Sequence, residues 1–274
     1  MTPRRHRAKR SLGQNFLVDP NLQRKIVEAV EAEPGDTVLE IGPGGEALTR
    51  HLAGTVDRLI LVELDDDLAA SLMDRYAGRD DVEVIHGDIL EVSLAALVDD
   101  PGALRVVGNI PYNITTPILF HLLERPRPRE MVLMVQEEVA DRIVAAAGTS
   151  AYGALAVGVQ SVADAAKLFR VGRKAFRPVP GVDSAVVRIR PRVPPPLTPA
   201  QETRLRDLVR ACFQWRRKQL RKILRDHPDL SVPADRIAVV ARTVGFRPTD
   251  RPETLSPAAF AALAATLPEG SGTP

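Results

Sequence analysis

The sequence predicts an α/β fold, in which a parallel sheet is covered by helices on both faces, followed by a small all-α C-terminal domain. Between residues 37 and 146, short apolar segments alternate with segments of helical periodicity. The apolar segments are continuously hydrophobic, which is typical of parallel strands buried on both faces. Beyond the proline-rich run at residues 191–196 only helical patterns follow, and this change indicates a second domain.

The first predicted helix begins at Asp19 and Pro20, after a basic stretch. Aspartate is a common helix N-cap, and proline is tolerated at the first helical position. The apolar face of this helix carries Leu22, Ile26, Val27 and Val30. The turn-forming residues Glu33-Pro34-Gly35-Asp36 end it.

The following segments alternate between strand and helix. The predicted strands are Thr37–Ile41, Arg58–Glu63, Val82–His86, Leu104–Gly108 and Met131–Val135. The predicted helices are Ala47–Ala53, Asp67–Tyr76, Thr116–Leu123 and Glu137–Ala146. Ligands of such a sheet bind beyond the carboxyl ends of its strands, so the functional residues are expected there.

The remaining chain contains an apolar segment, one more strand and a run of helices. These are Tyr152–Val162, then the strand Ser184–Ile189, then the helices Pro199–Phe213, Arg216–Leu224, Ala234–Val244 and Pro257–Leu267. We therefore predict a basic tail at residues 1–18, an α/β domain at 19–190, a proline-rich linker at 191–198 and a helical domain at 199–268. The small polar residues 269–274 are predicted to be a frayed end.

The composition of the 274 residues is that of an ordinary globular protein with a net charge of +2. The single cysteine, Cys212, excludes an internal disulfide and fits a reducing cytoplasm, where we expect the protein to lie. No apolar run is long enough to span a bilayer, and no apolar segment follows the basic tail, so neither a membrane span nor a secretory signal is expected. The few histidines are scattered, so no metal site is expected. The basic tail carries Arg4, Arg5, Arg7, Lys9 and Arg10.

A strand, a glycine-rich turn and a helix start follow one another at residues 38–47. The pattern Gly42-x-Gly44-x-x-Ala47 satisfies a loose dinucleotide fingerprint. However, acids at Glu40 and Glu46 make the turn a poor cradle for pyrophosphate, which is bound by bare N–H groups. S-adenosylmethionine carries a cationic amino-acid group and no phosphate, so it suits this loop better than NAD does.

Two further acids follow the next strands. Glu63 ends the second strand and is predicted to bind ribose hydroxyls, whichever nucleoside cofactor is bound. Asp88 follows the third strand, where its carboxylate can accept a hydrogen bond from an adenine amine. A turn or a helix cap is the structural alternative for Asp88.

The fourth strand runs into Asn109-Ile110-Pro111-Tyr112, a segment suited to holding a planar amine. The Asn109 side-chain oxygen can accept a hydrogen bond from an –NH₂ group, and Pro111 fixes the backbone so that a carbonyl of Ile110 or Pro111 can be a second acceptor. Tyr112 offers a face on which a flipped-out base can stack. A strand-ending turn would explain the tetrapeptide alone. Together with the loop and the two acids, it predicts a methyl-transfer site.

A second basic cluster contains no acid between its ends: Arg210, Arg216, Arg217, Lys218, Arg221, Lys222 and Arg225. Such a cluster is often only a solvated face. Beside a pocket for adenine, however, it is predicted to bind the phosphates of a structured RNA, as is the basic tail. The residues predicted to bind RNA are Arg216, Arg217, Lys218, Arg221 and Lys222.

These segments resemble, in order, the motifs of the ribosomal RNA adenine dimethyltransferase family. The similarity extends from about Lys9 to Leu267, and it includes residues 175–186 and 213–221. One departure is Trp215, which stands where a shorter polar residue is expected; another is Gly45-Glu46, in a variable part of the loop. The remaining matching motifs are Gly13-Gln14-Asn15-Phe16-Leu17, Glu40-Ile41-Gly42-Pro43-Gly44, Val62-Glu63-Leu64-Asp65, Gly87-Asp88 and Asn109-Ile110-Pro111-Tyr112-Asn113.

The resemblance implies a Rossmann-like class I methyltransferase that uses S-adenosylmethionine to dimethylate two adjacent adenines near the 3′ end of 16S ribosomal RNA in the small subunit. It implies cofactor contacts at Asn15, Leu17, Gly42, Glu63, Asp88 and Asn109. Catalytic roles are predicted for Asn109, Pro111, Tyr112 and Phe176. Phe176 would cover the second face of the base, and a core aromatic is the equally weighted alternative for it.

Other functions remain open at this stage. The same chemistry on 23S ribosomal RNA, as in erythromycin-resistance methyltransferases, is the nearest alternative. A non-catalytic nucleic-acid-binding or assembly factor on the same fold is the second, and an assembly role can also accompany catalysis. A nicotinamide-dependent dehydrogenase would explain the glycine pattern but not residues 109–112. A monomer is the expected state.

Overall fold

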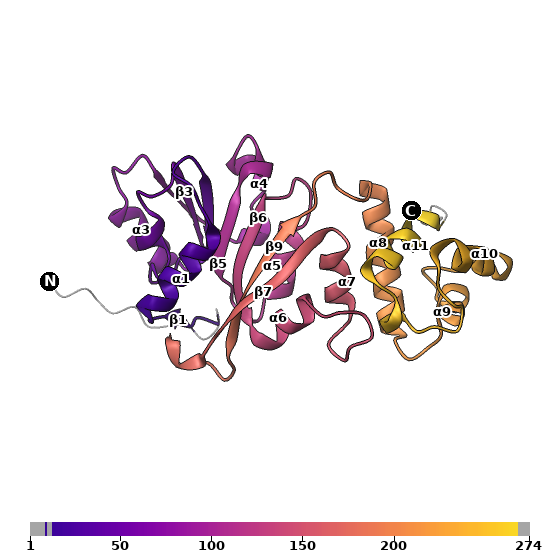
Figure 1. Cartoon of the computed structure of the whole chain (residues 1–274). Helices are drawn as coiled ribbons and strands as arrows, with labels where there is room; N and C mark the ends of the chain where they lie inside the picture. The colour runs from indigo at the N-terminus through magenta and orange to yellow at the C-terminus, as the bar shows by residue number, and fades with distance from the viewer. Residues whose placement is uncertain (1–8, 10–12, 268–274) are drawn as a thin grey trace. The chain divides into compact units, whose positions relative to one another are not determined.

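The computed structural model describes Lys9 and residues 13–267 of the chain. The chain forms two compact units, one of Met1–Ala140 with Ala166–Pro191 and the other of Asp141–Ala165 with Arg192–Pro274 (Figure 1). The predicted basic-tail residues Arg4, Arg5, Arg7 and Arg10, and the predicted frayed end at residues 269–274, lie outside the described residues.

The first unit is built on a seven-stranded sheet with the strand order β4-β3-β2-β5-β6-β9-β7. Neighbouring strands from β4 to β6 are parallel, as predicted, but β9 runs antiparallel to β6, so the sheet is mixed. An antiparallel edge on a mainly parallel sheet is common, and the hydrophobicity of a strand does not reveal its direction. The strands are β2 (Thr37–Ile41), β3 (Arg58–Glu63), β4 (Val82–His86), β5 (Arg105–Asn109), β6 (Glu130–Gln136), β7 (Ala163–Val171) and β9 (Ser184–Pro191).

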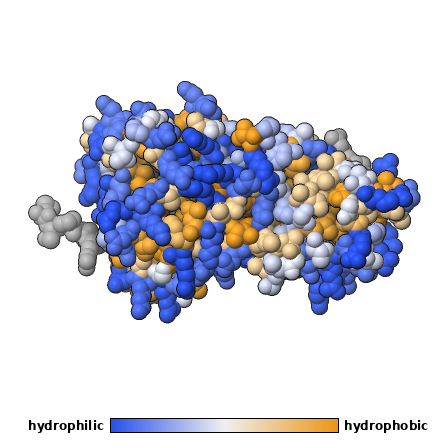
Figure 2. Space-filling model, viewed as in Figure 1, coloured by the Kyte–Doolittle hydropathy of each residue, from blue (hydrophilic) through white to orange (hydrophobic). Residues whose placement is uncertain are grey.

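Both faces of this sheet are covered. Successive residues of a strand point to opposite faces, and the neighbours Val38 and Leu39 are both fully buried, as are Ile60 and Leu61. On the face shown in Figure 2, hydrophilic side chains cover most of the surface of this unit. The helices of the unit are α1 (Pro20–Val30), α2 (Thr49–Leu52), α3 (Asp66–Arg75), α4 (Leu94–Leu97), α5 (Thr115–Leu122) and α6 (Glu137–Ile143).

Helix α1 begins as its sequence predicts. The Asp19 carboxylate accepts hydrogen bonds from the N–H groups of Asn21 and Leu22, and Pro20 is the first helical residue. Just before the helix, the short strand β1 (Phe16–Leu17) pairs antiparallel with β8 (Phe176–Arg177). This pairing ties the N-terminal segment to a distant part of the same unit.

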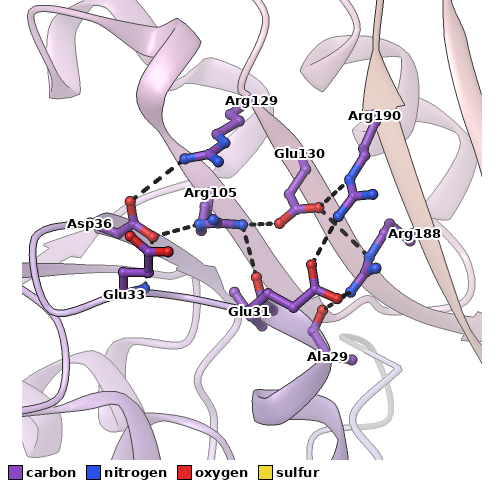
Figure 3. A network of polar contacts seen from close by, with 10 residues as sticks. Ala29, Glu31, Glu33, Asp36, Arg105, Arg129, Glu130, Arg188 and Arg190 are labelled. Atoms are coloured by element: carbon purple, nitrogen blue, oxygen red, sulfur yellow. Dashed lines mark hydrogen bonds and ion pairs between the residues drawn. The ribbon is translucent and has the colours of Figure 1, made fainter.

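A buried network of ion pairs joins the amino ends of the central strands (Figure 3). Arg105 in β5 donates hydrogen bonds to Asp36 at 2.6 Å and to the Val30 carbonyl at 3.0 Å, and it also pairs with Glu130 in β6. Glu130 also accepts from Arg190 in β9 at 2.8 Å. Arg105 and Glu130 are 4% and 1% exposed, so these charges depend on one another for compensation.

The second unit is helical, with α7 (Ala154–Gln160), α8 (Pro199–Gln214), α9 (Leu220–Asp226), α10 (Ala234–Val244) and α11 (Pro257–Thr266). Its core is apolar, and within it the Tyr152 hydroxyl donates to the Leu255 carbonyl at 2.7 Å. Burial raises the pKa of the Cys212 thiol to about 12, so this cysteine is unreactive at neutral pH. Within the described part of the chain, no helix combines the length and the apolar character needed to cross a membrane.

Candidate active site

One pocket of the first unit gathers residues from the carboxyl ends of β2, β3, β4 and β5 and from the N-terminal segment. This is the edge of the sheet where ligands were expected. Most of the residues predicted from sequence to act in cofactor binding or catalysis line it: Asn15, Leu17, Gly42, Glu63, Asp88, Asn109, Pro111 and Tyr112. Phe176 is not among the lining residues.

The glycine-rich turn is held open by Glu63. Gly42 and Gly44 adopt φ angles of +63° and +54°, in the left-handed region that favours glycine. The Glu63 carboxylate accepts hydrogen bonds from the N–H groups of Gly44 and Asp65, both at 2.9 Å. Burial raises the pKa of Glu63, although these two hydrogen bonds favour its charged form. The carboxylate thus links the turn to the start of α3 and still lines the pocket.

Glu40 lines the same pocket but is only 2% exposed. The Thr49 hydroxyl donates to its carboxylate at 2.7 Å. Burial raises the pKa of Glu40 to about 8, because the charged form loses its hydration, and the nearby Glu63 and Glu46 add to this effect. A cationic group that enters the pocket would restore the carboxylate form.

Replacing Glu40 with glutamine is therefore expected to stabilise the ligand-free protein as the pH rises, while weakening cofactor binding. In the unfolded chain Glu40 loses its proton above its ordinary pKa of 4.5, whereas in the folded protein it keeps the proton up to about 8. Between these values the wild type loses stability with rising pH, by about 1.4 kcal/mol per pKa unit, and the amide variant does not. Thermal unfolding below pH 4.5 and above pH 8 measures the effect. An equal gain at both pH values would contradict it, as would unchanged S-adenosylmethionine affinity.

The N-terminal segment is fastened across this pocket by Asp65, whose side chain is fully buried. Lys9 Nζ pairs with the Asp65 carboxylate at 2.8 Å, and Gln14 Nε2 donates to it at 2.9 Å. The following residue of the segment, Asn15, offers its backbone carbonyl to Asn109 Nδ2 at 2.9 Å. Sequence analysis assigned no role to Asp65. Its position two residues after Glu63, at the N-cap of α3, was the available signal.

The hydrogen bond to Asn15 fixes the orientation of the Asn109 amide. Because Nδ2 is the donor to that carbonyl, Oδ1 remains available as an acceptor for a ligand in the pocket. The preceding Gly108 allows close packing at this point, since a Cβ there would lie 2.8 Å from the Ile41 carbonyl oxygen. Asn109 is thus positioned by contacts on two sides.

The backbone after Asn109 distinguishes between two possible acceptors for an amine. The Pro111 carbonyl already accepts hydrogen bonds from the Ile114 N–H at 3.2 Å and the Thr115 hydroxyl at 3.1 Å. Ile110 is therefore the better source of a second carbonyl acceptor. The ring of Tyr112 is fixed by a hydrogen bond of 2.6 Å between its hydroxyl and Ser184 Oγ. Burial raises the pKa of Tyr112, which keeps the phenol neutral.

Two predicted residues have the contacts of their structural alternatives. The Asp88 carboxylate accepts from the Leu90 N–H at 2.9 Å and caps a short 3₁₀ helix, Ile89–Glu91, while it also lines the pocket. Phe176 is fully buried in the core of the unit, opposite Leu17 in the β1–β8 ladder. Contact of either side chain with a ligand stays a prediction.

The residues predicted to bind RNA lie in the helical unit. Arg216 pairs with Glu253 at 2.9 Å, and Arg221 donates to the Gln219 side chain at 2.9 Å. Arg217, Lys218 and Lys222 line a second cavity together with Arg216, Gln214 and Trp215.

Comparisons with known proteins point in one direction. The family model of ribosomal RNA adenine dimethylase matches residues 5–240. The chain is 44% identical over 259 residues to Ribosomal RNA small subunit methyltransferase A of Acinetobacter baylyi, covering 94% of this chain and 92% of that protein. It is also 44% identical over 269 residues to the protein of the same name from Pseudomonas aeruginosa, covering 97% of each.

Solved structures share the whole fold. A dimethyladenosine transferase from Plasmodium falciparum superposes with a TM-score of 0.78 at 28% identity, over 90% of this chain and 95% of that one. The 23S rRNA methyltransferase ErmE superposes with a TM-score of 0.70 at 30% identity, over 92% of this chain and 99% of that one.

Proposed function

Since this chain belongs to the ribosomal RNA adenine dimethylase family, we propose that it dimethylates two adjacent adenines near the 3′ end of 16S ribosomal RNA in the small subunit. It is an S-adenosylmethionine-dependent ribosomal RNA adenine dimethyltransferase. The choice of the small subunit is supported by identity: relatives named for small-subunit RNA reach 44%, whereas the 23S enzyme ErmE reaches 30%.

The observation that carries the proposed mechanism is the hydrogen bond from Asn109 Nδ2 to the Asn15 carbonyl, at 2.9 Å. It turns Asn109 Oδ1 toward the pocket, where it would accept a hydrogen bond from the adenine amine. The Ile110 carbonyl would accept from the other N–H of the same amine. The lone pair of this amine is normally delocalised into the ring, and holding both protons out of the ring plane would localise it on nitrogen.

Attack by that nitrogen on a methyl group is an in-line displacement, catalysed mainly by positioning and electrostatics. The nitrogen becomes positively charged as it is methylated, and its remaining proton becomes acidic, so no strong base is required. Tyr112 would stack on one face of the base, with its ring fixed by Ser184. Phe176 is proposed for the other face, which would require a side-chain movement out of the core.

The donor set of the pocket fits S-adenosylmethionine better than a phosphate-bearing cofactor. Two buried carboxylates, Glu40 and Glu63, suit an ammonium group and ribose hydroxyls and would repel phosphate. We propose that Asp88 binds the adenine amine of the cofactor and that Asn15, Leu17 and Gly42 line its site. When bound, this cofactor supplies an electrophilic methyl group on its sulfonium.

We further propose that the protein acts as a cytoplasmic monomer, and that binding to the small subunit contributes to subunit assembly. The substrate is tested by offering labelled S-adenosylmethionine with undermethylated small subunits, large subunits and free ribosomal RNA in parallel. Label in small-subunit RNA is expected. Label only in large-subunit RNA would assign the chain to the erythromycin-resistance type, and cofactor binding without transfer to any RNA would leave an assembly role alone.

A further inference from the structure

The helical unit contains a cavity at the end of α8 and in the turn that leads to α9. It is lined by Gln214, Trp215, Arg216, Arg217, Lys218 and Lys222. A hydrogen bond of 2.7 Å from the Lys218 N–H to the Trp215 carbonyl closes the turn on one side of the cavity. Cationic groups and one indole thus face a common space.

The charges of this cluster are not equally available. Acids neutralise Arg210, Arg216 and Arg225, through ion pairs with Asp207, Glu253 and Asp226. By contrast, Arg217, Lys218 and Lys222 make no ion pair with any residue that the structure describes. All three line the cavity, so the unpaired positive charge of the cluster converges there.

Trp215 is held in a fixed orientation beside these cations. The His227 ring packs edge-on against the indole, with the ring centroids 5.0 Å apart and the planes at 61°. The Asp229 N–H donates to His227 Nδ1, so Nε2 is the donor to Gln214 Oε1, at 3.1 Å. His227 is only 4% exposed, whereas Trp215 is half-buried and lines the cavity.

We infer that this cavity binds one unpaired nucleotide of the ribosomal RNA, with its base stacked on Trp215 and its phosphate bound by Arg217, Lys218 and Lys222. Proteins recognise single-stranded RNA by stacking bases on aromatic side chains next to basic groups. The bases of a duplex are stacked on one another, so the indole would add affinity only for an unpaired nucleotide. The inference rests on the proposed function, and it gives a role to the aromatic residue by which this chain departs from the expected polar one.

Trp215 is the only tryptophan of the chain, so its fluorescence reports directly on the cavity. A short single-stranded oligoribonucleotide titrated into the full-length protein is expected to quench it saturably, and a duplex of the same length is expected to quench it less. Trp215→Leu should lower the affinity for the single strand about tenfold, and Trp215→Phe should retain most of it. In the wild type, an oligonucleotide with abasic sites should bind as weakly as the intact one binds to Trp215→Leu. Replacing Lys218 or Lys222 with glutamine should reduce the salt dependence of binding by about 0.7 per lost contact.

Because Trp215 also packs against the core of its unit, each variant is first checked for wild-type S-adenosylmethionine affinity and thermal unfolding. Equal quenching by duplex and single strand would overturn the inference, as would a folded Trp215→Leu variant with unchanged affinity. The same wild-type preparation is assayed for methyl transfer to small subunits. Transfer without quenching contradicts only the nucleotide site, whereas quenching without transfer to any RNA contradicts the proposed function.

Discussion

Replacement of Asn109 by alanine is expected to lower the rate constant of methyl transfer by about 100- to 1,000-fold, the effect typical of losing one positioned hydrogen-bonding group in an active site. The side chain would be the acceptor that holds the adenine amine, and its orientation depends on the contact with the Asn15 carbonyl. Asn109 is also predicted to contact the cofactor, so a smaller loss of S-adenosylmethionine affinity is expected. Single-turnover transfer, together with calorimetric titration of the cofactor, separates the two effects.

Two further variants sharpen this prediction. Asn109→Asp keeps an oxygen acceptor but loses the donor to Asn15, so it is expected to fall between the wild type and Asn109→Ala. Asn21→Ala is the matched control, because Asn21 is an exposed residue of α1 that bonds only to nearby groups. A transfer rate in Asn109→Ala equal to that of Asn21→Ala would contradict the proposed role.

The second large effect is expected on stability. Glu130→Ala should destabilise the protein by about 3–5 kcal/mol, because it leaves buried guanidinium groups without their carboxylate. Arg105 would keep only Asp36 as an acidic partner, and Arg190 would lose its 2.8 Å contact (Figure 3). The neighbouring Arg188 Nε, which is buried without a hydrogen bond and 3.6 Å from Glu130, would lose its nearest compensating charge.

The matched control for this variant is Glu83→Ala. Glu83 pairs with Arg58 on the surface, where both side chains are exposed by more than a third, at 46% and 39%. Such pairs contribute only about 0–1 kcal/mol. Urea unfolding followed by circular dichroism compares the two variants with the wild type. Similar midpoints for Glu130→Ala and Glu83→Ala would show that the buried network does not stabilise the fold.

The central strands could be predicted from the sequence, whereas the far edge of the sheet could not. Strands β2 to β6 are continuously apolar because both of their faces are buried, and their predicted ends agree with the structure to about one residue. Strand β7 was missed, because most of its side chains are partly or fully exposed and it carries little hydrophobic signal. Helix α7 was seen only as an apolar segment, and no local pattern shows that it joins the helical unit.

The candidate site shows the same division. Gly42, Glu63, Asp88 and Asn109 could be grouped because each follows a strand, and parallel strands present their carboxyl ends at one edge. The contacts that set their chemistry join residues far apart in sequence. The bond from Asn109 to Asn15 and the clamp of Lys9 and Gln14 on Asp65 depend on the folded chain, and neither could be inferred from spacing. For Phe176 the sequence left two environments open, because an aromatic residue suits either.

The most direct test of the central claim is to identify the methylated atom. Undermethylated small subunits are incubated with S-adenosylmethionine and either wild-type protein or Asn109→Ala, and the digested RNA is analysed by mass spectrometry against authentic nucleoside standards. The account predicts N6,N6-dimethyladenosine with the wild type and its loss with the variant. Methylation at a ring atom of adenine or on another base would contradict it, because a site that holds an exocyclic amine would then have no part in the reaction.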